Sequence, residues 1–229
     1  MNGVYYKRNL PHYQPGNAVY FVTFRLADSL PGNLVKSLKE EYNALVNESK
    51  KIKDISRRKS ALLKSAKQYF GKFDKLLDGL QTGPLWLKED AIANLVYESI
   101  IYRDVIKYDL HCFTIMANHV HMVFRIGEVN VSRIADSTAR NSVSSYRVTK
   151  ILQDLKKYTA SESNKILKRS GQFWQNESYD HIIRNATEYT NVINYIINNP
   201  VKAGLVDDAA NWKWTYIADT VRELVKINA

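Results

Sequence analysis

The sequence predicts an α+β fold in which an antiparallel sheet carries helices on one face. Segments rich in β-branched and aromatic residues alternate with segments whose apolar residues recur at helical spacing. Two strand-like segments, 110–116 and 119–126, are separated by only two residues, a connection that joins antiparallel neighbours. The order strand, helix, strand pair, helix, strand, helix predicts a sheet whose second face is free to bind a partner.

The first strand signal is the run VYFVTFRL at 19–26, which reads as a buried strand. Pro31 and Gly32 then break the chain, and the pattern from Leu34 to about Leu80 is helical. We interpret this stretch, at about 34–82, as a helical insertion within a single domain that spans residues 1–229.

The insertion concentrates positive charge. Between Ser49 and Asp78, ten Lys or Arg residues face three Asp residues, a local excess of seven in a chain whose net charge is +10. One interpretation is a solvated helical face; the other is a surface that follows the phosphates of nucleic acid without reading its sequence. The candidate DNA contacts in the insertion are Lys50, Lys51, Arg57, Arg58 and Lys59.

Composition excludes the membrane, collagen and disulfide-scaffold classes. No apolar run approaches the ~20 residues of a membrane helix, and the segment 1–9 lacks the apolar core of a signal peptide. The single cysteine, Cys112, fits a reducing compartment. We therefore expect a soluble cytoplasmic protein that associates with the nucleoid and binds a polyanion.

The later part of the chain supplies the remaining elements. A helix is expected from Asp90, a polar helical stretch at 131–167, and a short strand at 179–183. Asn185 and Glu188 resemble a capping box that opens a helix, which we expect Pro200 to stop after Asn199.

His119 and His121 are the first candidates for chemistry. Residues i and i+2 of a strand point to the same face, so both imidazoles project together while Val120 faces the other way. Two neutral imidazoles placed in this way can share a divalent cation on the open face of the sheet. An isolated His-x-His pattern also occurs in surface or core histidines without such a role.

Tyr195 and Asn199 are the second pair of candidates. Tyr195 points roughly 130° away from the apolar stripe of its helix, and Asn199 lies one turn further on the same face. The simple interpretation is an exposed tyrosine packed on a neighbour. The functional one is a nucleophilic hydroxyl beside an amide oxygen that completes a His, His, amide metal site, which suits Mg²⁺ or Mn²⁺ while Zn²⁺ is chemically possible.

Several motifs together resemble one known family. The segment 116–124, MANHVHMVF, resembles the HUH motif of single-tyrosine transposases. The segments 171–175, 178–185 and 195–205 resemble motifs of the REP-associated tyrosine transposase group, and the stretch from His12 to Arg25 also fits. The resemblance runs from about residue 12 to 215 and skips the basic insertion.

This resemblance implies a ferredoxin-like HUH core that cuts and rejoins single-stranded, hairpin-forming repeat DNA in transposition or recombination. The reaction would pass through a covalent 5′-phosphotyrosine, leave a free 3′-hydroxyl and depend on Mg²⁺ or Mn²⁺. Carried over by position, His119, His121 and Asn199 are the metal ligands and Tyr195 is the nucleophile.

Several alternatives stay open at this point. Tyr179 is a rival nucleophile because it shares a strand face with His181, and Asp109 and Asp180 could orient the metal-binding histidines. Outside the insertion, Arg184 and Lys202 are the candidate DNA contacts.

The function has alternatives as well. A non-cleaving hairpin DNA-binding protein derived from such an enzyme is the main one. A replication initiator or relaxase is disfavoured because the chain has no P-loop. A homodimer whose partner chain supplies the tyrosine is a further possibility.

Overall fold

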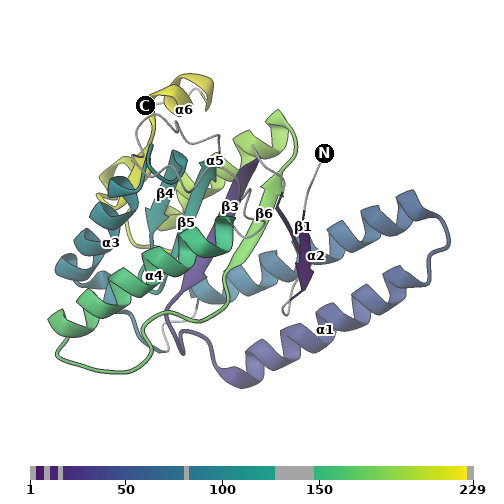
Figure 1. Cartoon of the computed structure of the whole chain (residues 1–229), viewed down its shortest axis with the longest axis horizontal. Helices are drawn as coiled ribbons and strands as arrows, with labels where there is room; N and C mark the ends of the chain where they lie inside the picture. The colour runs from purple at the N-terminus through teal and green to yellow at the C-terminus, as the bar shows by residue number, and fades with distance from the viewer. Residues whose placement is uncertain (1–3, 8–10, 15–17, 80–82, 127–146, 226–229) are drawn as a thin grey trace, which may run out of the picture. The chain divides into compact units, whose positions relative to one another are not determined.

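The computed structural model of the chain describes residues 4–7, 11–14, 18–79, 83–126 and 147–225. The chain forms two compact units (Figure 1). Unit 1 comprises Met1–Arg25 and Trp86–Ala229, and unit 2 comprises Leu26–Leu85. Part of the helical stretch expected at 131–167 lies outside the described residues, as do residues 15–17 of the stretch from His12 to Arg25.

Unit 1 is built on a five-stranded antiparallel sheet with the strand order β6-β3-β5-β4-β7. Its strands are β3 (Val19–Arg25), β4 (Asp109–Ile115), β5 (His119–Arg125), β6 (Tyr179–Ile183) and β7 (Thr215–Ile217). The α+β class with an antiparallel sheet is therefore confirmed. A separate two-stranded sheet pairs β1 (Val4–Lys7) with β2 (Pro11–Gln14).

The central strand β5 fixes the register of the site. Thr23 of β3 and Thr114 of β4 both lie directly opposite His121. The predicted two-residue connection between β4 and β5 is present, and it is closed by a 2.8 Å hydrogen bond from Met116 N to His119 O. Because β5 lies between two partners, the positions of its side chains are determined from both sides.

Two helices cover one face of the sheet, α3 (Asp90–Tyr102) and α4 (Arg147–Ile166) (Figure 1). Tyr97 of α3 packs edge-on against Phe113, with ring centroids 5.0 Å apart. On the same face Phe24 packs edge-on against Trp174, whose indole N–H donates to Thr159 of α4. This is the face to which Val120, Met122 and Phe124 point, as the alternation in β5 predicted.

The other face carries α5 (Ala186–Lys202), so it is less open than the sequence suggested. The Asn185 side chain accepts a 2.8 Å hydrogen bond from Glu188 N, which confirms the predicted N-terminal cap. The expected stop at Pro200 is wrong, since the helix continues to Lys202 with Pro200 inside it. In the last turn a proline removes one intrahelical bond, and Ala203 N and Leu205 N close the helix end on Asn199 O and Pro200 O.

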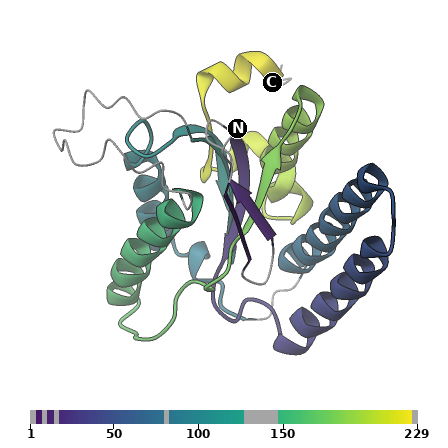
Figure 2. The same ribbon diagram turned by 45° about the vertical axis from the view of Figure 1, so that its right-hand side comes forward.

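Unit 2 is a helical hairpin of α1 (Gly32–Lys50) and α2 (Ile55–Gly79), which lie side by side in both views (Figure 2). Tyr42 and Tyr69 join the two helices with ring centroids 4.9 Å apart, and Lys72 pairs with Glu41 across them. Asp54 begins α2 by accepting a 2.7 Å hydrogen bond from Arg57 N. Two helices thus occupy the stretch in which the sequence predicts a helical insertion.

The remaining elements are short: η1 (Trp86–Lys88), η4 (Ala209–Asn211) and α6 (Asp219–Val225). Among the described helices, none combines the length and the apolar character needed to cross a membrane.

Candidate active site

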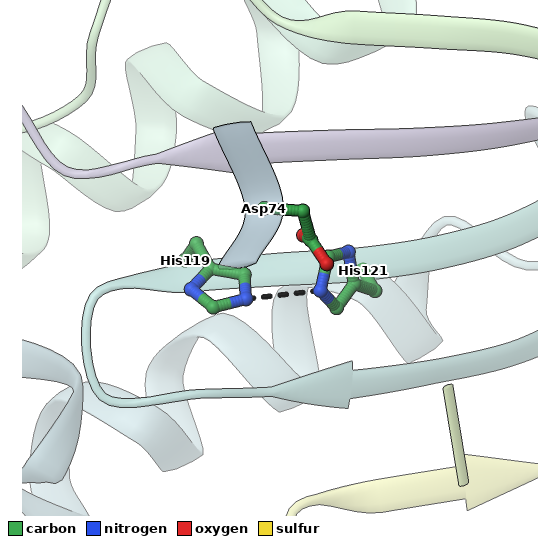
Figure 3. Close-up of side chains that lie close together, drawn as sticks. All are labelled: Asp74, His119 and His121. Atoms are coloured by element: carbon green, nitrogen blue, oxygen red, sulfur yellow. Dashed lines mark hydrogen bonds between the residues drawn. The ribbon is translucent and has the colours of Figure 1, made fainter. Parts of the chain in front are cut away.

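The two histidines of β5 face each other. The Nε2 atoms of His119 and His121 lie 2.9 Å apart, with the ring planes inclined by 73° (Figure 3). Asp74, also drawn in Figure 3, belongs to unit 2. The shared face was predicted, but its openness was not correct: the two side chains are 1% and 0% exposed. Buried polar atoms need hydrogen-bond partners, so the partners of the ring nitrogens bear on whether these histidines can bind a metal ion.

The Nδ1 atom of each ring, which faces away from the other histidine, has a hydrogen-bond partner. The Nδ1 atom of His119 donates to Asn118 Oδ1 at 2.6 Å, and His121 Nδ1 lies 2.8 Å from Thr23 Oγ1. Such outer contacts orient metal-binding histidines. Sequence reasoning missed both residues, although Asn118 directly precedes His119 and Thr23 interrupts an apolar strand.

The carboxylates proposed for this role lie elsewhere. Asp109 pairs with Arg125 at 2.5 Å, at the far end of β4 from the histidines. Asp180 lies opposite Val22, so it points to the face that α3 and α4 cover. Asp109 is therefore distant from the imidazoles along the strand, and Asp180 is on the opposite face of the sheet.

Both histidines are neutral at physiological pH. Burial lowers the pKa of His119 to about 3. Burial also holds the pKa of His121 well below its usual range, and electrostatic interactions with His119 and with the Lys202 ammonium group lower it further. The neutral imidazole is the form that binds a metal ion.

Asn199 reaches the histidine pair from α5. Its Nδ2 atom lies 3.5 Å from His121 Nε2, and the residue is fully buried. Among the described residues, no group donates a hydrogen bond to Asn199 Oδ1. A buried carbonyl oxygen without a donor is costly, so an ion at this point would relieve a real deficit.

Tyr195 lies one helical turn before Asn199. Its ring centroid is 5.4 Å from that of His121 and 6.3 Å from that of Phe21. The Tyr195 hydroxyl oxygen is buried and has no hydrogen-bond partner within the described part of the chain. Lys202 Nζ lies 5.2 Å from the centroid of the Tyr195 ring. The structure therefore brings together five predicted site residues: His119, His121, Tyr195, Asn199 and Lys202.

These donors fit a divalent metal ion. Two ligands at right angles on an octahedral ion with ~2.1 Å bonds lie about 3.0 Å apart, and the two Nε2 atoms are separated by 2.9 Å. Two imidazoles and one amide oxygen leave further positions for phosphate oxygens and water. The residues thus suit a bound ion, and their donor set does not by itself select one element.

Other predicted residues lie further away. Tyr179 shares a face with His181, as predicted, and packs against Phe21. It belongs to edge strand β6, two strands and thus roughly 10 Å from β5. Arg184 precedes α5, whose first nine residues rise about 14 Å before Tyr195.

The five candidate DNA contacts of the insertion lie at one end of the unit 2 hairpin. Lys50 is the last residue of α1, and Lys51 follows it in the connection to α2. Arg57, Arg58 and Lys59 lie in the first turns of α2. Arg58 is half-buried and the other four are exposed.

A second polar cluster anchors α5 to the sheet. The Tyr189 hydroxyl oxygen forms a 2.9 Å hydrogen bond with His111 Nδ1, and His111 Nε2 lies 3.7 Å from Asp109. His111 sits at an irregularity in the pairing of β4 with β5. Cys112 beside it is fully buried, and burial raises the pKa of its thiol, which fits a structural rather than a reactive cysteine.

The chain was compared with known proteins. No family model matches it. The REP-associated tyrosine transposase of Escherichia coli (strain K12) is 38% identical over 56 residues, which make up 24% of this chain and 34% of that protein. The match thus spans about a third of the relative's length, and it confirms the resemblance that the motifs predicted.

A solved structure, that of a REP-associated tyrosine transposase bound to a REP hairpin, is also similar. It shares 16% sequence identity at a TM-score of 0.48, over 92% of this chain and 80% of the other.

Proposed function

We propose that this chain, which is similar to REP-associated tyrosine transposases, is a metal-dependent single-strand DNA endonuclease and strand transferase. It acts on hairpin-forming repeat DNA through a covalent 5′-phosphotyrosine. The observation that carries the proposal is a pair of buried oxygens, Tyr195 Oη and Asn199 Oδ1, which lack a partner among the described residues and belong to side chains that lie against His121. Substrate and ion would supply the missing partners.

In this proposal His119 Nε2, His121 Nε2 and Asn199 Oδ1 hold Mg²⁺ or Mn²⁺. When bound, the ion supplies Lewis acidity to a non-bridging phosphate oxygen. The neutral state of the two rings keeps both Nε2 atoms available as ligands. The burial of all three side chains keeps competing water away from them.

Tyr195 is the proposed nucleophile. Its Oη atom forms a bond to phosphorus as the bond from phosphorus to the 3′-oxygen breaks; the phenol loses its proton and the leaving 3′-oxygen gains one. One phosphodiester is exchanged for another, so rejoining requires no external energy source. Lys202, whose ammonium group lies close to the Tyr195 ring, would neutralise charge on the phosphate during this exchange.

DNA is held by basic side chains in this proposal. Lys202 and Arg184 lie at opposite ends of α5 and would contact phosphates on either side of the cleaved bond. The exposed basic residues at one end of the unit 2 hairpin would follow the backbone of the same DNA. Residues 1–229 would then act as one DNA-processing domain with a helical insertion, in the cytoplasm at the nucleoid.

The test is an adduct assay with end-labelled single-stranded hairpins taken from the DNA beside the gene, with Mn²⁺ or with chelator. We expect a denaturation-resistant protein–DNA adduct that requires Mn²⁺ and disappears in Tyr195→Phe. Tyr179→Phe is the matched control, because it removes the rival hydroxyl on the same sheet face and should leave the adduct unchanged.

Two outcomes would contradict the proposal. Adduct formation that persists in Tyr195→Phe and disappears in Tyr179→Phe would move the nucleophile to β6. Tight, salt-sensitive hairpin binding without any adduct, across a set of related oligonucleotides, would favour a non-cleaving hairpin-binding protein. Mixing Tyr195→Phe chains with His119→Ala chains tests a homodimer: restored cleavage would mean that the partner chain completes the site.

A further inference from the structure

Trp212 differs from the other tryptophans of the chain in what surrounds its ring. Trp86, Trp174 and Trp214 each pack against an aromatic ring, and a cationic group also lies over the rings of Trp86 and Trp214. The Trp212 side chain is half-buried, and within the described part of the chain it makes no aromatic or cation–π contact. Its ring therefore has surface on which no described residue stacks.

The orientation of Trp212 is nevertheless fixed. Its indole N–H donates a 3.0 Å hydrogen bond to Ile115 O. Its backbone N–H donates to Ala209 O at 3.2 Å, and its carbonyl oxygen accepts from Thr215 N at 3.1 Å. The N–H is the only polar group of an indole, so the faces of the ring are left for stacking contacts alone. A ring held in this way is pre-organised for a partner.

The hydrogen bond to Ile115 places Trp212 at the edge of the proposed site. Ile115 is the last residue of β4 and lies opposite Val120, the residue between the two site histidines. Ile115 N donates to Trp214 O, so the backbone groups of Ile115 point away from β5, and the indole lies roughly 10 Å from that strand. The element before Trp212, η4, packs against α5, the helix that carries Tyr195.

An indole that served only to satisfy Ile115 O would cap the edge of the sheet and do nothing more. That role needs the N–H of Trp212, whereas the faces of the ring take no part in it. An unpaired base can stack on such a face, because every base has a π face of its own. Paired bases are already stacked within a duplex, so single-stranded DNA, the proposed substrate, is the partner that fits.

We propose that the Trp212 ring stacks on an unpaired base of the single-stranded DNA next to the phosphate that is cleaved at the proposed site. This inference rests on the proposed function and adds a contact to it. The contact is to the face of a base, so it selects unpaired DNA without reading its sequence.

The test measures binding in chelator, so it requires neither the metal ion nor cleavage. Hairpin oligonucleotides from the DNA beside the gene carry one abasic site at a time in the single-stranded flank, and fluorescence anisotropy gives their affinity. In the wild type we expect one abasic position to weaken binding by about 5- to 150-fold. In Trp212→Leu the same abasic site should change the affinity by less than about twofold, because the stacking contact is already lost. An abasic effect of equal size in both proteins, or none at any position in the wild type, would overturn the inference.

Two substitutions separate stacking from the structural role of the indole N–H. Trp212→Phe and Trp212→Leu both lose the hydrogen bond to Ile115, but only phenylalanine keeps a flat ring. Trp212→Phe should bind the intact hairpin within about threefold of the wild type, and Trp212→Leu about 5- to 150-fold more weakly. Equal losses in the two variants would overturn the inference.

Trp214→Leu is the matched control. The Trp214 ring lies near Tyr97 of α3, which covers the face of the sheet away from the histidines. Its removal should therefore leave the affinity for the hairpin within about threefold of the wild type. A loss in Trp214→Leu as large as that in Trp212→Leu would indicate damage to the turn rather than a lost stacking contact, and would overturn the inference.

The proposed function can fail separately. If the abasic effect depends on Trp212 but no adduct forms with Mn²⁺, the stacking contact stands and the cleavage reaction is wrong. If the adduct forms and the abasic effect does not depend on Trp212, only the stacking role is wrong.

Discussion

Asn199 Nδ2 lies 3.5 Å from His121 Nε2, although 78 residues separate the two side chains in the sequence. The contact joins the last turns of α5 to the central strand of the sheet, and the amide oxygen of the same Asn199 side chain is buried without a partner of its own in the described structure. It also places Tyr195, one turn earlier, beside the same ring. The packing of α5 on β5 thus brings the residues of the proposed catalytic site together.

Asn199→Ala should weaken Mn²⁺ binding by at least about tenfold, which corresponds to about 1.4 kcal/mol. The substitution removes the only proposed oxygen ligand, and titration calorimetry measures the result. Asn198→Ala is the matched control, because its exposed side chain donates to Asn194 O on the outer side of α5. Equal losses in the two variants would indicate damage to the helix rather than a lost ligand.

The stability of the metal-free protein should fall in acid because of His119. Its pKa is about 3 in the folded chain, against about 6.5 when unfolded. Between these values the unfolded chain binds a proton that the folded chain does not, so stability decreases as the pH falls below about 6.5 and is unaffected above it. Relative to His119→Gln, the wild type should lose up to about 1.4 kcal/mol per pH unit in this window.

Urea unfolding of both proteins at pH 8, 7, 6 and 5 measures this difference. The values at pH 8 and 7 are the internal control, since the difference between the two proteins should be constant there. Curves that remain parallel down to pH 5 would mean that His119 is not held neutral by the fold.

Tyr189→Phe should destabilise the fold by about 1 kcal/mol, because it removes the hydrogen bond from α5 to His111. Burial raises the pKa of Tyr189 to about 12, so the hydroxyl keeps its proton at neutral pH. The shift in the urea midpoint measures the loss. Tyr102→Phe, at a position that is 74% exposed, should change stability by less than about 0.5 kcal/mol. Equal shifts in the two variants would argue against the anchoring role.

Removing three charges from the unit 2 hairpin should reduce the salt dependence of DNA binding. For the triple variant Lys51→Ala, Arg57→Ala and Lys59→Ala, each lost phosphate contact lowers the slope of log K against log salt by about 0.7–0.9. Fluorescence anisotropy with a hairpin oligonucleotide from 50 to 300 mM salt measures the slope. Lys36→Ala, Lys88→Ala and Lys165→Ala together are the charge-matched control. An unchanged slope in the first triple variant would assign the basic residues to a solvated face.

The sequence by itself determined how each functional side chain is directed from its own element. The period of two in β5 places His119 and His121 on one face, and the period of 3.6 in α5 places Tyr195 and Asn199 together. The same local patterns predicted the strands, the turn at 117–118 and the Asn185 cap. These features depend on contacts between residues close in sequence, so their spacing is sufficient to predict them.

Only the tertiary structure decided which elements meet and what they bury. The strand register selects Thr23, rather than Asp109 or Asp180, as the partner of His121. The packing of α5 on the histidine face brings Asn199 to His121, on a face that the sequence predicted to be open. Strand register and helix packing depend on long-range contacts between complementary surfaces, and the local spacing of residues carries no information about them.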